Sequence, residues 1–315
     1  MQRTSQTIVI LGTGGTIAGT AQTSTDNVGY TAAQIGVAEL VAAVPPLKGQ
    51  PLECEQVAQL DSKDMDFATW QLLAQRVAHH LARSDVAGIV ITHGTDTLEE
   101  TAYFLHRLLA PTKPVVLTAA MRPATSLQTD GPQNLADAVS VARAPGAQGV
   151  LAVLAGRVHG ALDVRKHHSY RIDAFSSGDA GPLALLEEGV LRPLRAWPAG
   201  EALGLSCVAL EPAHWPRVEL VTSHAGADGA LVQALCKLGA AGIVVAATGN
   251  GTVHQRLEDA LRKAMADGVQ VLRATRCAQG AIIGQDEQAL PSAGGLSPVK
   301  ARVELMLRLL GERAK

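Results

Sequence analysis

The feature that most constrains the fold is a regular alternation of short apolar runs with amphipathic helical segments. This pattern is typical of α/β proteins, in which helices cover both faces of a mostly parallel sheet. The segment after Asp130 is also expected to be a helix, with Asp130 as its N-cap and Pro132 in its first turn. The expected strands are Thr7–Leu11, Gly88–Thr92, Pro114–Thr118 and Gly149–Leu154, and the other expected helices are Gln34–Val44, Asp66–Arg83 and Thr97–Leu109.

A second, shorter α/β series follows a stretch in which the periodicity fades. Four prolines interrupt residues 189–216, which we interpret as a linker. The chain is therefore expected to form a larger N-terminal α/β domain with a doubly wound, mostly parallel sheet (residues 1–188), and a smaller C-terminal α/β domain (residues 217–315). The second series predicts strands at Val218–Val221, Gly242–Ala246 and Val269–Arg273, and helices at Gly229–Leu238, at Val253–Ala266 and after Ser297–Pro298.

Composition excludes several classes of function. The net charge is −2 and the basic residues are dispersed, so no nucleic-acid surface is expected. No apolar run approaches the length of a membrane span or of a signal-peptide core, which favours a cytoplasmic location unless a signal has been removed. The four cysteines form no CxxC motif, and neither a disulfide framework nor a metal site is expected. The adjacent pairs His79–His80 and His167–His168 are interpreted as solvated positions.

Three polar loops follow predicted strands. They are Gly12–Gly19 (GTGGTIAG), His93–Thr97 (HGTDT) and Ala119–Pro123 (AAMRP). Ligands of open parallel sheets bind beyond the carboxyl ends of the strands, so these loops predict a site in the N-terminal domain.

The first two loops allow more than one interpretation. Gly12–Gly19 is a tight turn, a dinucleotide-binding loop or the carrier of a Thr16 nucleophile. Ile17 replaces the third glycine of the dinucleotide fingerprint, and no GK[ST] motif is present. His93–Thr97 either caps the following helix through Asp96 or Thr97, or presents the Thr95 hydroxyl beside the Asp96 carboxylate.

These segments together resemble the asparaginase/glutaminase family, in particular the bacterial L-asparaginases that use a threonine nucleophile. The resemblance lies in TGGTIA and HGTDT and extends through ETAYFL, AMRP, DGPQNL, Gly-Asn-Gly and KARV, over nearly the whole chain. It implies hydrolysis of L-asparagine to L-aspartate and ammonia through an acyl-enzyme intermediate, with no metal or organic cofactor. It also implies a small amino-acid substrate, no nucleic-acid or membrane partner, and a homotetramer with sites completed across an intimate dimer.

The resemblance further implies roles for individual residues. Thr16 is the nucleophile, and Tyr30 covers the site and helps to activate Thr16. Thr95, Lys166 and Asp96 form a second polar cluster, in which Lys166 supports the Thr95 hydroxyl. A threonine hydroxyl is a weak nucleophile until a neighbour accepts its proton, which explains the need for such groups.

The same resemblance implies a set of substrate contacts. Ser62 and Asp96 hold the α-carboxylate and the α-ammonium of the substrate, and Ala120 offers its backbone to the amide. Backbone N–H groups of Gly94 and Thr95 are candidates for an oxyanion hole. Asn250 and an acid after Arg276 come from the neighbouring subunit, and ungapped counting places this acid at Glu287, with Asp286 as the alternative.

Lys63 departs from the family pattern, which usually has a neutral or acidic residue after the serine. A cation near the substrate's ammonium is repulsive, so Lys63 is expected to point away or to meet a carboxylate, such as that of the substrate or Glu287. This departure concerns substrate affinity and selectivity.

Three alternatives compete with an asparaginase. The first is a glutaminase-asparaginase of broader specificity, because one methylene group changes discrimination only slightly. The second is a non-catalytic amino-acid-binding protein on the same fold, which should lack Thr16 or Lys166. The third is an NAD-linked oxidoreductase, which the missing third glycine and the lack of a clear ribose-binding acid disfavour.

Overall fold

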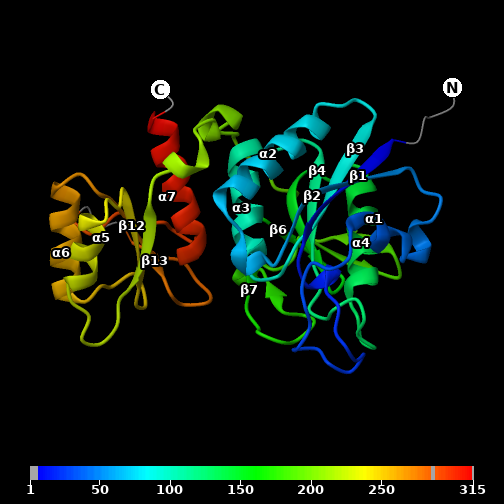
Figure 1. Ribbon diagram of the computed structural model, residues 1–315. Coiled ribbons are helices and arrows are strands. Elements are labelled where there is room, and N and C mark those ends of the chain that lie inside the picture. Colours follow the sequence, from blue (N-terminus) through cyan, green and yellow to red (C-terminus); the bar gives the residue numbers. More distant parts are fainter. Residues whose placement is uncertain (1–5, 285–287, 314–315) are drawn as a thin grey trace. The chain divides into compact units, whose positions relative to one another are not determined.

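The computed structural model of the chain describes residues 6–284 and 288–313 (Figure 1). It divides into two compact units, Met1–Leu205 and Ser206–Lys315. Within the described residues, no helix combines the length and the apolar character needed to cross a membrane. The segment interpreted as a linker, residues 189–216, contains a strand of the first unit, and the division between the units falls inside it.

The first unit contains an eight-stranded sheet with the order β10-β9-β6-β5-β4-β3-β1-β2. The five strands from β5 to β2 are parallel, while β6, β9 and β10 extend the sheet in antiparallel fashion. A separate two-stranded sheet is formed by β7 (Arg165–Lys166) and β8 (Phe175–Ser176). The strands of the large sheet are β1 (Thr7–Gly14), β2 (Leu52–Leu60), β3 (Val86–Thr92), β4 (Pro114–Thr118), β5 (Gly149–Leu154), β6 (Arg157–Gly160), β9 (Ala184–Glu187) and β10 (Val190–Pro193).

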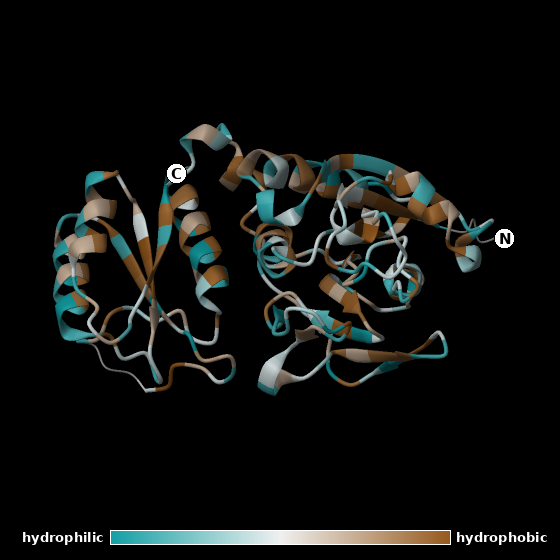
Figure 2. Ribbon diagram, turned by 60° about the horizontal axis from the view of Figure 1, so that its bottom comes forward, coloured by the Kyte–Doolittle hydropathy of each residue, from teal (hydrophilic) through white to brown (hydrophobic). Residues whose placement is uncertain are grey.

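Helices cover both faces of this sheet, as the sequence predicts (Figure 1). Helices α1 (Val37–Ala42) and α4 (Gly131–Arg143) pack on one face, in a cluster that includes Ile10 and Val90. Helices α2 (Phe67–Leu81) and α3 (Leu98–Leu109) lie on the other face and are joined by stacking of Trp70 on Phe104. The central strands β1, β3, β4 and β5 are almost wholly buried, and Figure 2 shows hydrophobic residues in brown on strands that lie among the helices.

One helical connection has the opposite hand to the others. The connections β2–α2–β3, β3–α3–β4 and β4–α4–β5 all progress in the same direction along the sheet, yet α4 lies on the face opposite to α2 and α3. Because connections between parallel strands are right-handed in nearly all proteins, β4–α4–β5 is a left-handed exception. This connection places α4 beside α1.

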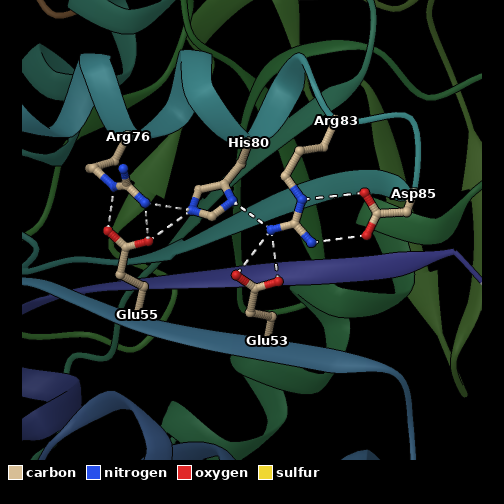
Figure 3. A network of polar contacts seen from close by, with 6 residues as sticks. All are labelled: Glu53, Glu55, Arg76, His80, Arg83 and Asp85. Atoms are coloured by element: carbon tan, nitrogen blue, oxygen red, sulfur yellow. Dashed lines mark hydrogen bonds and ion pairs between the residues drawn. The ribbon is translucent and has the colours of Figure 1, made fainter.

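Strand β2 was not predicted from the sequence, because its alternating polar residues hide it. It forms the edge of the sheet, where charged residues protect exposed backbone from pairing with other chains. Its Glu53 and Glu55 side chains bind residues at the end of α2 (Figure 3). Arg76 donates to Glu55, and Arg83 donates to Glu53.

His80 lies within this network, so its interpretation as a solvated residue was wrong. Its side chain is 2% exposed. The Glu55 carboxylate can only accept, so His80 Nε2, which lies 2.8 Å from it, carries a proton, and His80 Nδ1 lies 3.1 Å from Arg83 Nη1. The hydrogen bond from Arg76 is the main reason that the pKa of Glu55 is lowered to about 2. The network therefore links the edge strand β2 to α2, and the Glu55 carboxylate within it stays charged at neutral pH.

The second unit is a three-layer α/β unit with a parallel sheet of order β11-β12-β13. Its predicted strands and helices are all present, with ends that differ by one or two residues. Its strands are β11 (Val218–Thr222), β12 (Gly242–Ala247) and β13 (Gln270–Thr275), and its helices are α5 (Ala230–Lys237), α6 (Gln255–Ala266) and α7 (Pro298–Arg313).

Candidate active site

The site lies where the strand order of the large sheet reverses. Strand β1 is connected through α1 to β2 on one side, while its other neighbour, β3, continues to β4 in the opposite direction. In α/β sheets a crevice forms at such a switch point, beyond the carboxyl ends of the strands. The Gly12–Gly19 and His93–Thr97 loops leave β1 and β3 at this point.

Two glycines bring these loops into direct contact. A Cβ atom on Gly15 would lie 2.3 Å from the Cα of Gly94, and Gly15 has a φ of 81°. No other residue type fits this close approach. Since Thr16 and Thr95 each follow one of these glycines, the close approach of the two backbones brings the two threonines near each other.

Thr16 is buried at the start of a 3-10 helix (Thr16–Ala18). Its Oγ1 lies 2.7 Å from the phenol oxygen of Tyr30. The Tyr30 ring packs over Gly19, where a Cβ atom would lie 2.9 Å from the ring. The structure thus brings the proposed nucleophile and the proposed covering tyrosine together, and Tyr30 can exchange a proton with Thr16.

The second cluster joins Thr95, Lys166 and Asp96. Lys166, from β7, donates to Thr95 Oγ1 at 2.8 Å and to Asp96 Oδ1 at 2.6 Å. The Lys166 side chain is only 19% exposed. Asp96 and Thr97 make no side-chain cap to α3, since Thr97 instead donates to the Ser62 carbonyl. The alternative interpretation of this loop as a helix cap is therefore wrong.

Ser62 and Lys63 follow β2 and lie beside the same cluster. Asp96 N–H donates to Ser62 Oγ at 3.1 Å, so Ser62 contacts the backbone of the residue whose carboxylate is predicted to bind the ammonium. Lys63 is exposed and forms an ion pair with Asp64, with Asp61 at 3.9 Å. The Lys63 ammonium therefore meets a carboxylate of its own turn.

Buried backbone groups face the same region. In the part of the chain that the structure describes, the N–H groups of Gly94 and Thr95 have no hydrogen-bond partner, although both residues are buried. Unpaired buried N–H groups are rare, and they stabilise an oxyanion well when a substrate fills the site. Ala120 is also buried, and it packs with Ile17 and Ala18 next to Thr16.

Asn250 belongs to the second unit. It is exposed, and its side-chain amide both donates to and accepts from the backbone of Ile283, at 2.9 and 2.8 Å. Glu287 and its alternative Asp286 lie outside the described residues. The contribution of these residues to a neighbouring site stays a prediction.

A histidine that sequence reasoning left without a role supports the His93–Thr97 loop. His93 is fully buried, and its Nδ1 lies 2.7 Å from the Gly94 carbonyl oxygen, so Nδ1 carries the proton. Trp70 donates to Thr101, and the Thr101 hydroxyl donates in turn to His93 Nε2. Burial lowers the pKa of His93 to about 4, so the ring is neutral and fixes the loop without adding charge.

The geometry of the first loop disfavours a dinucleotide site. A pyrophosphate needs the amino end of a long helix directly after the glycines. Here the loop leads into a three-residue 3-10 helix, and α1 begins only at Val37. The site instead contains two buried threonine hydroxyls, one beside a phenol and the other beside an amine and a carboxylate. Groups of these kinds can accept a proton from a hydroxyl.

Comparison with known proteins identifies the family. The chain matches the family described as "Asparaginase, N-terminal" over residues 7–197 and the "Glutaminase/Asparaginase C-terminal domain" over residues 217–314. The chain therefore belongs to the asparaginase family.

Individual relatives resemble almost the whole chain. L-asparaginase 2 of Bacillus subtilis is 39% identical, with 96% of this chain and 82% of the relative covered. A glutaminase-asparaginase of Pseudomonas fluorescens biotype A is 35% identical, with 96% and 86% covered. The crystal structure of a probable cytoplasmic L-asparaginase from Campylobacter jejuni matches with a TM-score of 0.91 and 35% identity, covering 98% of both chains.

Proposed function

We propose that this protein is an enzyme that hydrolyses L-asparagine to L-aspartate and ammonia, with Thr16 as the nucleophile. The observation that supports the proposal is the close approach of the Gly15 and Gly94 backbones, beside which Thr16 contacts Tyr30 and Thr95 contacts Lys166. Membership of the asparaginase family supports the substrate. A non-catalytic binding protein would not need this pair of assisted hydroxyls.

The proposed reaction proceeds in two steps. Thr16 Oγ1 attacks the carbon of the substrate's side-chain amide while its proton passes to the neighbouring polar groups, of which Tyr30 is within hydrogen-bond distance. The C–N bond breaks, the nitrogen takes a proton and leaves as ammonia, and an ester to Thr16 remains. Water then attacks this ester, which releases L-aspartate and restores the hydroxyl. The N–H groups of Gly94 and Thr95 stabilise the oxyanion of both steps.

Ser62 and Asp96 orient the substrate in this proposal. The Asp96 carboxylate, which is half exposed, binds the α-ammonium, and Ser62 binds the α-carboxylate. Lys166 already forms an ion pair with Asp96, so the bound ammonium shares this carboxylate with Lys166. Substrate binding therefore changes the charge environment of the amine that supports Thr95.

Glutamine is the competing substrate, because relatives of both specificities match the chain. The test is ammonia release from L-asparagine and L-glutamine measured side by side. We expect asparagine to give the higher kcat/KM. Release from neither amino acid would contradict the proposed function, while equal values would favour a glutaminase-asparaginase.

A cytoplasmic location also stays a prediction.

We predict that Lys63 affects substrate affinity. Replacing Lys63 with Gln should lower the KM for asparagine by about twofold to fivefold, because it removes a cation near the substrate's ammonium. The effect is small because Asp64 pairs with Lys63 and solvent screens the charge. The value of kcat should hardly change, since ground state and transition state are affected alike. An unchanged KM for both asparagine and glutamine would mean that Lys63 has no role in selectivity.

We further predict a homotetramer built from close dimers, with Asn250 and Glu287 completing the site of a partner subunit. Light scattering should give the mass of four chains, and a fully active monomer at assay concentration would contradict the prediction. Co-expression of Thr16→Ala with Asn250→Ala tests the shared site. If each site takes Thr16 and Asn250 from different subunits, a mixed dimer of the two variants has one intact site and one site that carries both substitutions. Random pairing makes about half of the dimers mixed, so about a quarter of all sites should be intact.

A further inference from the structure

The Asp130 side chain does not cap α4, contrary to the expectation from the sequence. No side-chain cap hydrogen bond is present at this helix start. The carboxylate instead turns to the loop that follows β4. It accepts from the Met121 N–H at 3.1 and 3.0 Å and from the Arg122 N–H at 3.0 Å. Asp130 therefore acts on the Ala119–Pro123 loop rather than on its own helix.

Asn134, one turn further along α4, acts on the same loop. It is 2% exposed, and its Nδ2 donates to the Ala119 carbonyl at 2.9 Å and to Asp130 Oδ2 at 3.1 Å. Its Oδ1 accepts from the Ala155 N–H at 3.0 Å, which fixes the orientation of the amide. The two side chains thus form one unit in which each has defined donors and acceptors.

These contacts determine the orientation of both peptide groups that flank Ala120. A trans peptide group is planar, with its C=O and N–H pointing in opposite directions. The Met121 N–H points at Asp130, so the Ala120 carbonyl of the same peptide group points away from it. Likewise, the Ala119 carbonyl points at Asn134, so the Ala120 N–H points away from Asn134. The backbone of Ala120 has no freedom to rotate without breaking these bonds.

The Ala120 carbonyl and N–H, whose directions are determined in this way, have no hydrogen-bond partner among the described residues. Among residues 6–284 and 288–313, nothing hydrogen-bonds to the Ala120 carbonyl or N–H, although the residue is buried. A buried backbone group without a partner costs free energy unless a ligand satisfies it. Ala120 also packs against Ile17 and Ala18, the two residues after Thr16. The unpaired groups therefore lie next to the loop of the nucleophile.

We propose that Asp130 and Asn134 are positioning residues of the active site, which together aim the Ala120 carbonyl at the N–H of the substrate's side-chain amide. The inference rests on the proposed function. The carbonyl accepts from the amide nitrogen and holds the amide carbon in line with Thr16. Asp130 and Asn134 do not touch the substrate. Their contribution is the direction of one carbonyl group.

The proposal separates two properties of the enzyme. L-aspartate has no amide N–H, and its α-groups are addressed by Ser62 and Asp96. Loss of the Ala120 orientation should therefore impair turnover of asparagine but not the binding of L-aspartate. A general loosening of the site would weaken both, so the comparison distinguishes positioning from a purely structural role.

Asp137 offers a matched control on the same helix. Asp130 and Asp137 line the same cavity of about 500 Å³, and burial raises the pKa of both carboxyl groups. Asp137 accepts from the Gln133 side chain at 2.8 Å, and in the part of the chain that the structure describes it forms no hydrogen bond with the Ala119–Pro123 loop. Replacement of Asp137 by Asn removes the same charge from the same cavity without affecting the loop.

The experiment compares Asp130→Ala, Asp130→Asn, Asn134→Ala and Asp137→Asn in the full chain. For each, kcat and KM for asparagine are measured, together with the Kd for L-aspartate by calorimetry and the Tm. We expect Asp130→Ala to lower kcat about 100-fold, the loss typical of a reacting group displaced by about 1 Å. Asp130→Asn keeps one acceptor oxygen for the loop and should recover part of this loss. Asp137→Asn should resemble the wild type.

The Kd for L-aspartate should change by less than about twofold in every variant that folds. An unchanged kcat in Asp130→Ala, or a Kd that rises as much as kcat/KM falls, would overturn the proposal. If Asp130→Ala does not fold, Asp130→Asn and Asn134→Ala decide the question by the same comparison. Wild-type protein that releases no ammonia would contradict the proposed function itself, whereas active wild type with insensitive Asp130 variants would contradict only this inference.

Discussion

Replacing Thr16 with Ala should reduce kcat for asparagine by several orders of magnitude while leaving the fold intact. The substitution removes the Thr16 hydroxyl, whose oxygen lies 2.7 Å from the phenol oxygen of Tyr30. Without it no ester can form, and residues that act as a catalytic unit show losses of this size when one is removed. Steady-state ammonia release measures the effect, and circular dichroism verifies that the variant is folded.

Thr16→Ser is the matched control for this prediction. It keeps the hydroxyl on the same backbone and should retain a substantial part of the activity. A folded Thr16→Ala variant with more than about a tenth of the wild-type kcat would exclude Thr16 as the nucleophile. In that case Thr95, the second hydroxyl of the site, becomes the candidate.

Replacing Lys166 with Met should cause a loss of comparable size, and so should replacing Thr95 with Val. Lys166 bonds to both Thr95 and Asp96, and each substitution keeps the volume while it removes the polar group. If the three side chains act as a unit, the double variant Lys166→Met/Thr95→Val should be little worse than either single variant. Measurement of kcat for all three variants tests this non-additivity.

Lys113→Met serves as the control for removal of a half-buried lysine. Lys113 donates to the carbonyls of Leu81 and Arg83, at 3.0 and 2.6 Å, and its loss should affect stability but not kcat. Additive losses in the Lys166 and Thr95 variants would show that these residues work independently. Near wild-type activity of Lys166→Met would remove the lysine from the mechanism.

Much of the fold was predictable because buried strands and amphipathic helices leave a clear periodic pattern. The strands Pro114–Thr118 and Gly149–Leu154 were predicted with their observed ends, since both are fully buried, consist almost entirely of apolar residues and lie in the centre of the sheet. Strand β2 was missed because an edge strand carries charged residues, here Glu53 and Glu55, which partners distant in the sequence neutralise.

The residues of the candidate site could be predicted from the sequence, but the residues that hold them in position could not. Glycines and threonines at the ends of strands mark Thr16 and Thr95 in the sequence itself. The contacts of His93 and Asp130 carry no such mark, because their partners are a buried threonine and the backbone of another loop. An aspartate before a helix is usually a cap, and this local rule gave the wrong role for Asp130.

The sequence by itself determined the α/β class, the family and the identity of the chemical groups, because periodicity and short motifs are local properties of a chain. Only the tertiary structure decided which groups meet: Gly15 against Gly94, Lys166 between Thr95 and Asp96, and Asp130 beneath the Met121 N–H. These contacts depend on the order of the strands and on the left-handed connection to α4. Long-range order of this kind results from the packing of whole layers, which no short segment encodes.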